Sequence, residues 1–504
     1  MKVLVANRGE IAVRIIRGCR NHGIETVAVY SEVDRAEQHV RMADQAVPIG
    51  PPEPAKSYLA IDRIVAAAKQ SGADAIHPGY GFLSENAAFA QAVTDAGITF
   101  IGPSADSIRR MGDKILARQA MEAAGVPVVP GTLEPLSDAD EAGRTADEMG
   151  YPVMLKAVGG GGGKGIRVVK SADEIKSAFE RASSEALNAF GNGAMYIEKY
   201  LANPRHIEVQ ILADSHGNCI HYGERECSIQ RRHQKVVEEA PSAVITPEVR
   251  AEMGAVAVRA AKAIGYVNAG TCEFLMDESG DFYFLEMNTR LQVEHPVTEI
   301  VYRVDLVREQ LRIAAGEKLL HTQEDVRGVG HAIEVRVYAE DPQSNFLPSA
   351  GRIEHLELPG GPGVRLDTNL YEGQEISLYY DPILGKLITF GSSRASAIRR
   401  LVQALREFSV TGIKTTIPFL LRVLKHPKFL SGEFDTNFID RHMADLESEG
   451  EGLQKIPAAI AAVLWSRERA RARKPAATTG NGGGASPWTL AGRRAATGRG
   501  GTGR

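Results

Sequence analysis

The sequence predicts a multidomain protein with an N-terminal α/β domain followed by α+β domains. Strands alternate with helices over about the first 115 residues, five consecutive glycines separate two apolar strands, and the strands expected after residue 205 are typical of antiparallel sheets. A chain of 504 residues has room for two to four domains of about 100–200 residues each.

The first domain has the pattern of a doubly wound parallel sheet. A helix that presents Ile11, Ile15 and Cys19 on one face follows the first strand and ends near Gly23. A sheet of this kind binds its ligand beyond the carboxyl ends of its strands. The predicted strands cover residues 2–7, 26–30, 73–77 and 99–102.

A proline-rich linker over residues 125–135 separates this domain from the rest of the chain. The later strands are predicted at residues 153–158, 166–169, 195–200, 206–213, 219–224, 271–276, 282–287, 332–339 and 383–390. The accompanying helices are predicted at residues 172–190, 247–264, 303–315 and 394–407. We therefore expect domains over residues 1–115, 116–204, 205–330 and 331–445, and then a linker and a disordered, basic, glycine-rich tail over residues 446–504.

The composition, 43% hydrophobic and 24% charged, is ordinary for a soluble globular protein. Together with the next three observations it points to the cytoplasm. No apolar run approaches the roughly 20 residues needed to cross a bilayer, and no secretory signal follows Met1. The four cysteines have no metal-ligand spacing, which favours free thiols. Residues 466–504 contain nine Lys or Arg and one Glu, which gives this tail a charge of +8. Because the net charge of the whole chain is −4, the remaining residues carry about −12. An acidic domain of this kind argues against nucleic-acid binding.

The loop over residues 159–165 is rich in glycine and lies between two predicted strands. Glycine lets backbone N–H groups approach a polyphosphate closely, and five in a row make a loop mobile enough to close over a nucleotide. A Walker loop is excluded because Gly165 replaces the Ser or Thr that should follow Lys164. A dinucleotide-binding loop is excluded because a strand follows instead of a helix. We predict a phosphate-binding loop rather than a surface hairpin.

For three cationic parts of the sequence, the residues alone are compatible with two roles each. Lys156 alternates with the apolar residues of the strand before the loop, so its amine either reaches solvent or points at a bound anion. Lys114 is equally compatible with a nucleotide contact and with an ordinary surface lysine. The charged segment over residues 224–235 is equally compatible with a solvated face and with an anion-binding wall.

The segment over residues 273–288 predicts an acidic β-hairpin with its turn at residues 278–281. If Asp277 pairs with Phe282, counting outward places Glu273 opposite Glu286. Asn288 then falls on the same face. The apolar side chains expected on the other face, in the core, are Cys272, Phe274, Met276, Tyr283, Leu285 and Met287.

Two carboxylates that face each other across strands repel each other unless a cation lies between them. Glu and Asn oxygens are hard ligands suited to Mg²⁺, which also binds substrate phosphates. We therefore predict a metal site at Glu273, Glu286 and Asn288 rather than two solvated glutamates. The polar segment that follows can place Arg290 near an anion and Glu294 as a base.

Several long segments together resemble one family, the biotin carboxylases of the ATP-grasp superfamily. The resemblance extends from residue 1 to about residue 445. It implies a pre-ATP-grasp N-terminal domain, an ATP-grasp lid and central domain, and a C-terminal antiparallel domain. The segments that carry it are ANRGEIAVRIIR, HPGYGFLSEN, MGDK, KAVGGGGGKG, EKYLANPRHIEVQ, ERECSIQRRHQKVVEEAP, EMNTRLQVEHPVTE and YYDPILGKLI.

The resemblance implies a role for individual residues. Those that resemble ATP contacts are Lys114, Lys156, Gly162, Gly163, Glu198, Lys199, Leu201, His206, Gln230 and His233. Those that resemble metal ligands are Glu273, Glu286 and Asn288, and those that resemble the bicarbonate site are Lys235, Arg290, Gln292 and Val293. Glu294 resembles the base that deprotonates bicarbonate, and Arg336 resembles the residue that stabilises the biotin enolate.

The chemistry that the resemblance implies joins phosphoryl transfer to carboxylation. Bicarbonate attacks the γ-phosphate of ATP with Glu294 as base, while Mg²⁺ (or Mn²⁺), Lys156 and the glycine loop neutralise charge. Carboxyphosphate then releases CO₂, and biotin captures it after phosphate removes the ureido proton. A closed glycine lid protects carboxyphosphate from water.

The resemblance also implies partners. Biotin is carried on a lysine in an Ala-Met-Lys-Met context, whereas the only Met-Lys pair here is Met1-Lys2 and no carboxyltransferase-sized region follows. We expect a separate biotin carboxyl carrier protein, carboxyltransferase subunits and a homodimer. The expected complex is an acetyl-CoA or acyl-CoA carboxylase of fatty-acid synthesis, with propionyl-CoA and pyruvate carboxylase as alternatives. The tail segment over residues 486–493 resembles the linker of fused acyl-CoA carboxylases, and Trp488 in it is a candidate docking residue.

Three other classes of protein compete with this interpretation. Another ATP-grasp ligase, such as a carbamoyl-phosphate or purine-pathway carboxylating enzyme, would share the loop and the metal site. A non-catalytic nucleotide-binding regulator would lack some metal or base residues, yet all of them are present. A nicotinamide dehydrogenase is disfavoured because Arg8-Gly9-Glu10 follows the first strand instead of the glycine fingerprint.

Overall fold

The computed structural model describes residues 1–159, 165–447 and 464–465. Residues 1–447 form one unit and residues 448–504 a second. Gly162 and Gly163 of the predicted phosphate loop, and Trp488 of the tail, lie outside the described residues. In the described part of the chain no helix is long and apolar enough to span a membrane, and the four cysteines are free thiols.

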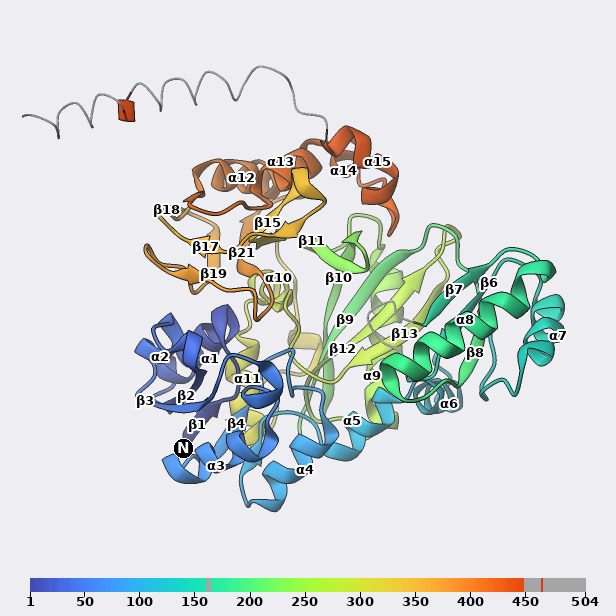
Figure 1. Cartoon of the computed structure of the whole chain (residues 1–504). Helices are drawn as coiled ribbons and strands as arrows, with labels where there is room; N and C mark the ends of the chain where they lie inside the picture. The colour runs from blue at the N-terminus through green and yellow to red at the C-terminus, as the bar shows by residue number, and fades with distance from the viewer. Residues whose placement is uncertain (160–164, 448–463, 466–504) are drawn as a thin grey trace, which may run out of the picture. The chain divides into compact units, whose positions relative to one another are not determined.

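The N-terminal part contains a five-stranded parallel sheet with the strand order β3-β2-β1-β4-β5, which confirms the predicted parallel sheet (Figure 1). The order reverses at β1, and doubly wound folds bind ligands at such a switch point. The sequence pattern missed β3, because the residues of this edge strand are largely exposed and lack apolar alternation. The strands are β1 (Lys2–Val5), β2 (Glu25–Ser31), β3 (Gln45–Gly50), β4 (Ala75–His77) and β5 (Thr99–Phe100).

Helices pack against this sheet and lead to the next part of the chain. The first predicted helix is confirmed, since Ile11, Ile15 and Cys19 are all buried against the sheet. The helices of this region are α1 (Gly9–Asn21), η1 (Glu32–Asp34), α2 (Gln38–Met42), η2 (Pro54–Lys56), α3 (Ile61–Ser71), α4 (Ala87–Asp95), α5 (Ala105–Gly112) and α6 (Lys114–Ala123).

A three-stranded antiparallel sheet, β7-β6-β8, follows the linker. The glycine loop joins β6 to β7, so the predicted order of strand, loop and strand is confirmed. The nitrogen of Ala157 donates a hydrogen bond of 3.0 Å to the oxygen of Gly165, which brings the two ends of the loop together. The elements are α7 (Ala139–Met149), β6 (Val153–Ala157), β7 (Ile166–Val169), α8 (Ala172–Phe190) and β8 (Met195–Lys199).

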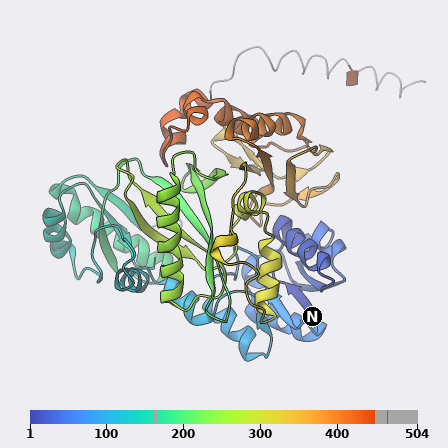
Figure 2. The same cartoon turned by 180° about the vertical axis from the view of Figure 1, so that it is seen from behind.

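An eight-stranded antiparallel sheet forms the largest part of the unit, with the order β13-β12-β9-β10-β11-β14-β21-β19 (Figures 1 and 2). The sheet continues across the domain boundary expected at residue 330, because β11 pairs directly with β14. Its strands are β9 (Arg205–Ala213), β10 (Cys219–Arg231), β11 (Gln234–Ala240), β12 (Asn268–Met276), β13 (Phe282–Asn288), β14 (His331–Tyr338), β19 (Val364–Thr368) and β21 (Ile383–Gly391).

Short elements and helices complete the unit. The helices are α9 (Pro247–Ala263), α10 (His295–Tyr302), α11 (Leu306–Ala314), η3 (Gln323–Asp325), η4 (Pro342–Ser344), α12 (Arg394–Glu407), α13 (Ile417–Lys425), α14 (Pro427–Ser431) and α15 (Phe438–Glu447). The short strands pair as β15 (Glu340–Asp341) with β16 (Leu347–Pro348), β17 (Gly351–Arg352) with β20 (Glu375–Ile376), and β18 (His355–Glu357) with β22 (Ser409–Thr411). Helix α10 packs on the large sheet through Val297 and Val301, which contact Ala332 and Ile388 in one apolar cluster.

In the β12–β13 hairpin Glu273 faces Glu286, as predicted, but the strand pairing between these residues and the turn differs from the prediction. Met276, not Asp277, pairs with Phe282, so the predicted register next to the turn is wrong by one residue. An irregularity between Phe274 and Glu273 restores the predicted pairing. In consequence Phe282 and Phe284 occupy the core positions that were predicted for Tyr283 and Leu285, which are only half-buried.

The charged segment over residues 224–235, for which a solvated face and an anion-binding wall were both considered, forms part of the β10–β11 hairpin. Arg231 pairs with Gln234, so Arg232 and His233 make a two-residue turn. Both have positive φ, 51° and 63°, as the favoured hairpin turns require. The hairpin therefore holds His233 at a fixed position next to Lys235.

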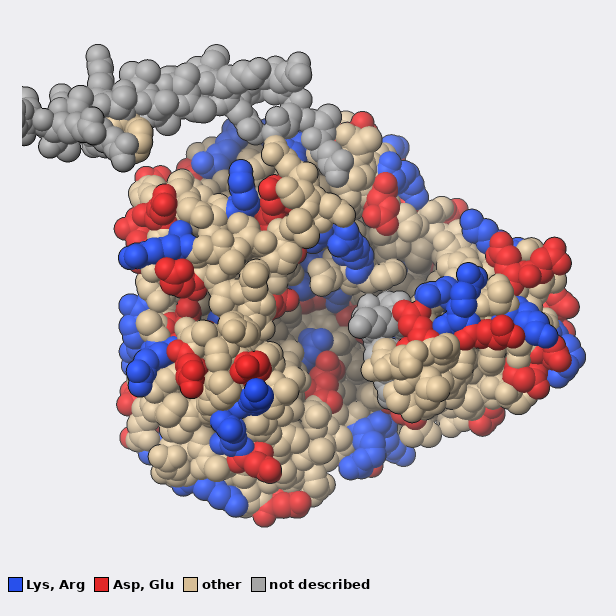
Figure 3. All heavy atoms as spheres, viewed as in Figure 1, with Lys and Arg blue, Asp and Glu red and all other residues tan. Residues whose placement is uncertain are grey.

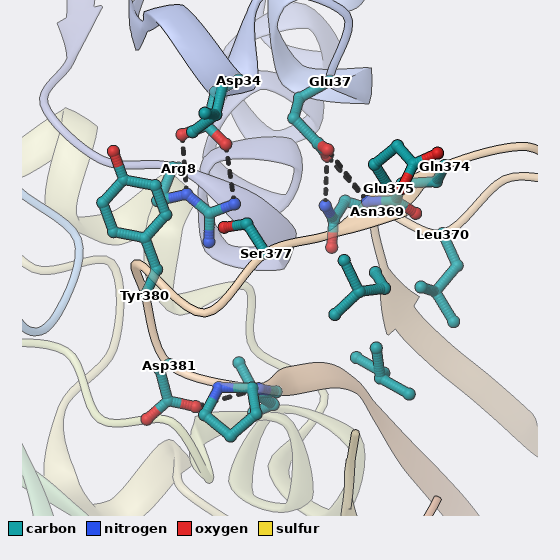
Figure 4. A pocket seen from close by; sticks show the side chains of 15 residues that line it. Arg8, Asp34, Glu37, Asn369, Leu370, Gln374, Glu375, Ser377, Tyr380 and Asp381 are labelled. Atoms are coloured by element: carbon teal, nitrogen blue, oxygen red, sulfur yellow. Dashed lines mark hydrogen bonds and ion pairs between the residues drawn. The ribbon is translucent and has the colours of Figure 1, made fainter. Parts of the chain in front are cut away.

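A small cavity of about 190 Å³ lies between the N-terminal sheet and the strands β19–β21 (Figure 4). The guanidinium of Arg8 donates two hydrogen bonds, of 2.7 and 2.8 Å, to the carboxylate of Asp34. The amides of Asn369 and Gln374 donate to the buried carboxylate of Glu37. The contacts of Glu37 join the N-terminal part of the unit to the segment between β19 and β20.

Candidate active site

A cavity of about 750 Å³ collects most of the residues predicted to be functional. Figure 3 shows a hollow on this face of the molecule, with both basic and acidic side chains in its walls. The predicted residues that line the cavity are Lys114, Lys156, Leu201, His206, Gln230, His233, Lys235, Glu273, Glu286, Asn288, Arg290, Gln292, Val293, Glu294 and Arg336.

Three glutamates lie side by side on three adjacent strands of the large sheet. Glu273 on β12 is the cross-strand partner of both Glu286 on β13 and Glu208 on β9. Next to them on β10, the fully buried guanidinium of Arg225 donates to the carboxylate of Glu208. Adjacent like charges are unfavourable, so this row of carboxylates needs cations around it.

Lys235 supplies one of these cations. Its Nζ atom donates hydrogen bonds of 2.5 Å to Glu208, 2.8 Å to Glu273 and 2.6 Å to Glu294. Burial alone would lower the pKa of Lys235, but the three carboxylates raise it well above its usual value. Lys235 is therefore a permanent positive charge at the centre of the cavity wall.

Glu294 lies at the N-terminus of α10, between two cationic side chains. Its Oε1 atom accepts from Lys235, and its Oε2 atom accepts a hydrogen bond of 3.1 Å from Nη2 of Arg336. Burial alone would raise the pKa of Glu294, but the charges of Lys235, Arg336 and Arg225 hold it well below its usual range. The side chain is thus a carboxylate at neutral pH, as a base must be.

The predicted metal ligands meet in the same cavity. Asn288 donates from Nδ2 to Oε1 of Glu273, over 2.8 Å. Burial and the charge of Glu273 raise the pKa of Glu286, so a cation between the two carboxylates would relieve their repulsion. The two carboxylates and the amide oxygen of Asn288 are hard donors, so this set fits Mg²⁺.

Arg290 is held between this group and the N-terminal domain. Its Nε atom donates over 2.8 Å to Glu85, and its Nη2 atom donates over 2.8 Å to Asn288. Glu85 also accepts from the backbone nitrogen of Thr289, over 3.0 Å. The loop after β13 is therefore anchored to the segment after β4.

The residues predicted to contact the nucleotide divide into two groups. Lys156 lines the cavity and forms a buried ion pair with Glu198, which also accepts a hydrogen bond of 2.6 Å from Arg118. The side chain of Lys199 turns away and donates to the backbone oxygens of Met149 and Gly150. Leu201 lines the cavity, whereas Glu198 and Lys199 do not.

Sequence reasoning missed four charged residues of this region. Glu208 and Arg225 lie behind the residues that line the cavity, where Glu208 contacts Lys235. Glu85 holds Arg290, and Asp381 lines both the large cavity and the small one. One signal was available for Glu208, because polar His206, Glu208 and Gln210 alternate with apolar residues along one strand. Nothing local distinguishes the other three from surface charges.

A glycine-rich segment between two antiparallel strands, and a cavity lined by residues of those strands together with paired carboxylates and lysines, define an ATP-grasp ligase. Family models agree with this class: "Biotin carboxylase, N-terminal domain" matches residues 1–108, "Carbamoyl-phosphate synthase L chain, ATP binding domain" matches residues 113–322, and "Biotin carboxylase C-terminal domain" matches residues 334–441. Biotin carboxylase 1 of Bacillus subtilis is 54% identical over 442 residues, which cover 88% of this chain and 98% of that protein. The chain belongs to the biotin carboxylase family.

Two further relatives extend the comparison. The propionyl-CoA carboxylase alpha chain of Ruegeria pomeroyi is 50% identical, with 94% of this chain and 73% of that protein covered. The biotin carboxylase domain dimer of the 2-oxoglutarate carboxylase of Hydrogenobacter thermophilus was solved in complex with MgADP, ADP and bicarbonate. It matches this structure with a TM-score of 0.85 at 50% identity, over 89% of this chain and 99% of that chain.

Proposed function

We propose that this chain carboxylates biotin on a separate biotin carboxyl carrier protein, using ATP, Mg²⁺ and bicarbonate. The observation that carries the proposal is the contact of Lys235 and Arg336 with the two oxygens of Glu294. A carboxylate between two fixed cations can accept a proton while an anion binds beside it. A related biotin carboxylase domain holds MgADP and bicarbonate, which supports the choice of substrates.

The first step is the attack of bicarbonate on the γ-phosphate of ATP. Lys235, Arg290, Gln292 and the backbone of Val293 bind bicarbonate, and Glu294 takes its proton. When the anion takes over hydrogen bonds of Lys235, Glu294 loses part of the stabilisation of its charged form and becomes a stronger base. Carboxyphosphate is the product of this step.

The remaining residues bind the nucleotide and stabilise charge. Glu273, Glu286 and Asn288 hold Mg²⁺, which neutralises charge on the phosphates. Lys114, Lys156 and the loop glycines Gly162 and Gly163 contact the phosphates, with His206, Gln230 and His233 nearby. The segment with Glu198, Lys199 and Leu201 reads the adenine edge, through its backbone where the side chains turn away.

The second step transfers CO₂ to biotin. Phosphate released from carboxyphosphate removes the ureido proton of biotin, and Arg336 stabilises the negative charge that develops on the ureido oxygen.

The complex we propose is a multisubunit acetyl-CoA or acyl-CoA carboxylase of fatty-acid synthesis in the cytoplasm, with a homodimer of this chain and carboxyltransferase subunits. Propionyl-CoA carboxylase is the second candidate. The match to its alpha chain covers 94% of the 504 residues, about 474 residues, so it includes part of the chain beyond the unit over residues 1–447. Pyruvate carboxylase is the third. Within the chain we assign residues 1–115 to the N-terminal domain, 116–204 to the lid, 205–330 to the central domain, 331–445 to the C-terminal domain and 446–504 to the linker and tail.

The test measures ATP hydrolysis by the purified full chain with and without bicarbonate and free biotin. We expect hydrolysis that requires bicarbonate and is stimulated by biotin. ATP binding without any such hydrolysis would favour a regulator, and stimulation by ammonia or a purine precursor instead of biotin would favour another ATP-grasp ligase. Purification with associated chains would identify the carboxyltransferase and hence the final acceptor.

A further inference from the structure

Two glutamates behind Arg336 have no part in the chemistry described so far. Glu238 on β11 and Glu334 on β14 are direct cross-strand partners. Both side chains are 0% exposed. Oε2 of Glu238 and both carboxyl oxygens of Glu334 have no hydrogen-bond partner among the described residues.

The remaining carboxyl oxygen of the two glutamates, Oε1 of Glu238, contacts Arg336. Nε of Arg336 donates a hydrogen bond of 2.6 Å to Oε1 of Glu238, while Nη2 donates to Glu294 on the cavity side. The guanidinium of Arg336 therefore lies between Glu238 of the buried pair and Glu294, and it donates a hydrogen bond to each. Any change in the charge of the pair acts directly on the guanidinium that faces the substrate.

The charged groups around the pair leave an excess of negative charge if every glutamate is ionised. Arg336 lies two residues beyond Glu334 on β14, and Lys386 on β21 is the cross-strand partner of Arg336. Helix α10, which covers this face, contributes Glu294 and His295 at its N-terminus. The ionisable groups that interact with the pair are Arg336, Lys386, Lys235, Glu294, Cys227 and Tyr338, with Glu10 beyond Lys386.

Two fully buried carboxylates opposite each other are costly when a single guanidinium contacts only one of their four oxygens, and such pairs share a proton. Burial, followed by the charge of Glu294, raises the pKa of Glu238 to about 7 against the lowering effect of Arg336. Burial also raises the pKa of Glu334 well above its usual value, despite the charge of Lys386. The direction for both groups agrees with the geometry.

We infer that Glu238 and Glu334 form a proton-sharing carboxyl pair that positions Arg336 and preserves its positive charge for the biotin step. The inference rests on the proposed function. With the shared proton in place, Glu294 and one negative charge on the pair face Arg336 and Lys386, and Glu10 contacts Lys386 from its other side. When Glu294 takes the proton of bicarbonate, its ion pair with Arg336 weakens, and Nη2 becomes available to the ureido oxygen. Glu238 meanwhile keeps Nε in position, and the proton of the pair is not consumed.

The test compares biotin-stimulated with biotin-independent, bicarbonate-dependent ATP hydrolysis, using the full chain, MgATP, bicarbonate and free biotin. Glu238→Leu should lower the ratio of the two rates about tenfold or more, the size expected for a lost hydrogen bond to a charged group. Glu238→Gln keeps an acceptor for Nε and should restore most of the ratio at neutral pH. Glu309→Gln, at a buried carboxyl group on α11 that contacts Arg312, is the matched control and should leave the ratio unchanged.

The pH profile separates positioning from a merely structural role. In the wild type, the biotin-stimulated kcat should fall as the pair loses its shared proton with rising pH. In Glu238→Gln and Glu334→Gln, which hold a permanent hydrogen in place of that proton, this alkaline fall should move to higher pH or vanish. These two substitutions conserve volume, so they answer the question even if Glu238→Leu does not fold.

Two outcomes overturn the inference alone: a wild-type ratio in folded Glu238→Leu, or profiles of both glutamine variants that superimpose on the wild type. A wild-type chain without any biotin-stimulated hydrolysis overturns the proposed function as well as the role of the pair. The two failures are therefore distinguished by the wild-type measurement.

Discussion

Nζ of Lys235 and Oε1 of Glu294 lie 2.6 Å apart, although β11 and the N-terminus of α10 are far apart in the sequence. The contact joins the row of carboxylates on the sheet to the first turn of the helix. It fixes the orientation of Glu294 before any substrate binds, because its other oxygen is held by Arg336. In the function we propose, proton acceptance by Glu294 and binding of an anion by Lys235 are thereby coupled.

Glu294→Gln should abolish bicarbonate-dependent ATP hydrolysis while ATP still binds. The amide preserves the shape of the side chain but cannot accept the proton, and loss of a general base costs about 10²-fold or more in rate. Steady-state ATP hydrolysis and calorimetric titration with a non-hydrolysable ATP analogue measure the two properties. Near-normal turnover would contradict the role of base.

Glu286→Gln should weaken binding of the magnesium-nucleotide complex by about tenfold or more, because one of two charged hard ligands is lost. Calorimetry with MgADP measures the affinity directly. Glu278→Gln, in the exposed turn of the same hairpin, is the control and should bind like the wild type. Equal affinities for the two variants would exclude Glu286 as a ligand.

Acid should destabilise the fold through His77, which is the fully buried last residue of β4. Burial lowers its pKa from 6.5 to about 3. Between these two pH values the histidine is protonated in the unfolded chain but neutral in the folded chain. The stability that depends on neutral His77 is complete above about pH 6.5 and declines as the pH falls toward about 3, by about 1.4 kcal/mol per pH unit. Urea unfolding at pH 7 and pH 5.5 measures the free energy of unfolding, which should decrease less between these pH values in His77→Gln than in the wild type. Replacement of the exposed His22 should keep the wild-type decline, and equal slopes for all three chains would refute the prediction.

Deletion of residues 466–504 should leave activity on free biotin within about twofold of the wild type, because every described residue of the cavity belongs to the unit over residues 1–447. Hydrolysis assays and circular dichroism check activity and folding. An insoluble or unfolded product would show instead that the tail is part of the folded structure.

Much of the fold could be predicted because strands, helices and turns leave local patterns. The parallel sheet, the glycine loop between two strands and the opposition of Glu273 and Glu286 were all expected from spacing. The register at the turn was predicted wrongly, since an irregularity in pairing leaves no trace in alternation. The edge strand β3 was missed because its exposed residues carry no apolar pattern.

The types of chemical group in the site and the segments that carry them follow from the amino-acid sequence, because motifs and hydrophobic periodicity are properties of neighbouring residues. Which charges meet depends on sheet order and on long-range register. Glu208 reaches Lys235 because β9, β10 and β11 are adjacent strands, and Glu238 faces Glu334 because β11 pairs with β14. Burial then sets the protonation of these groups, and burial is a property of the packed chain, not of any segment alone.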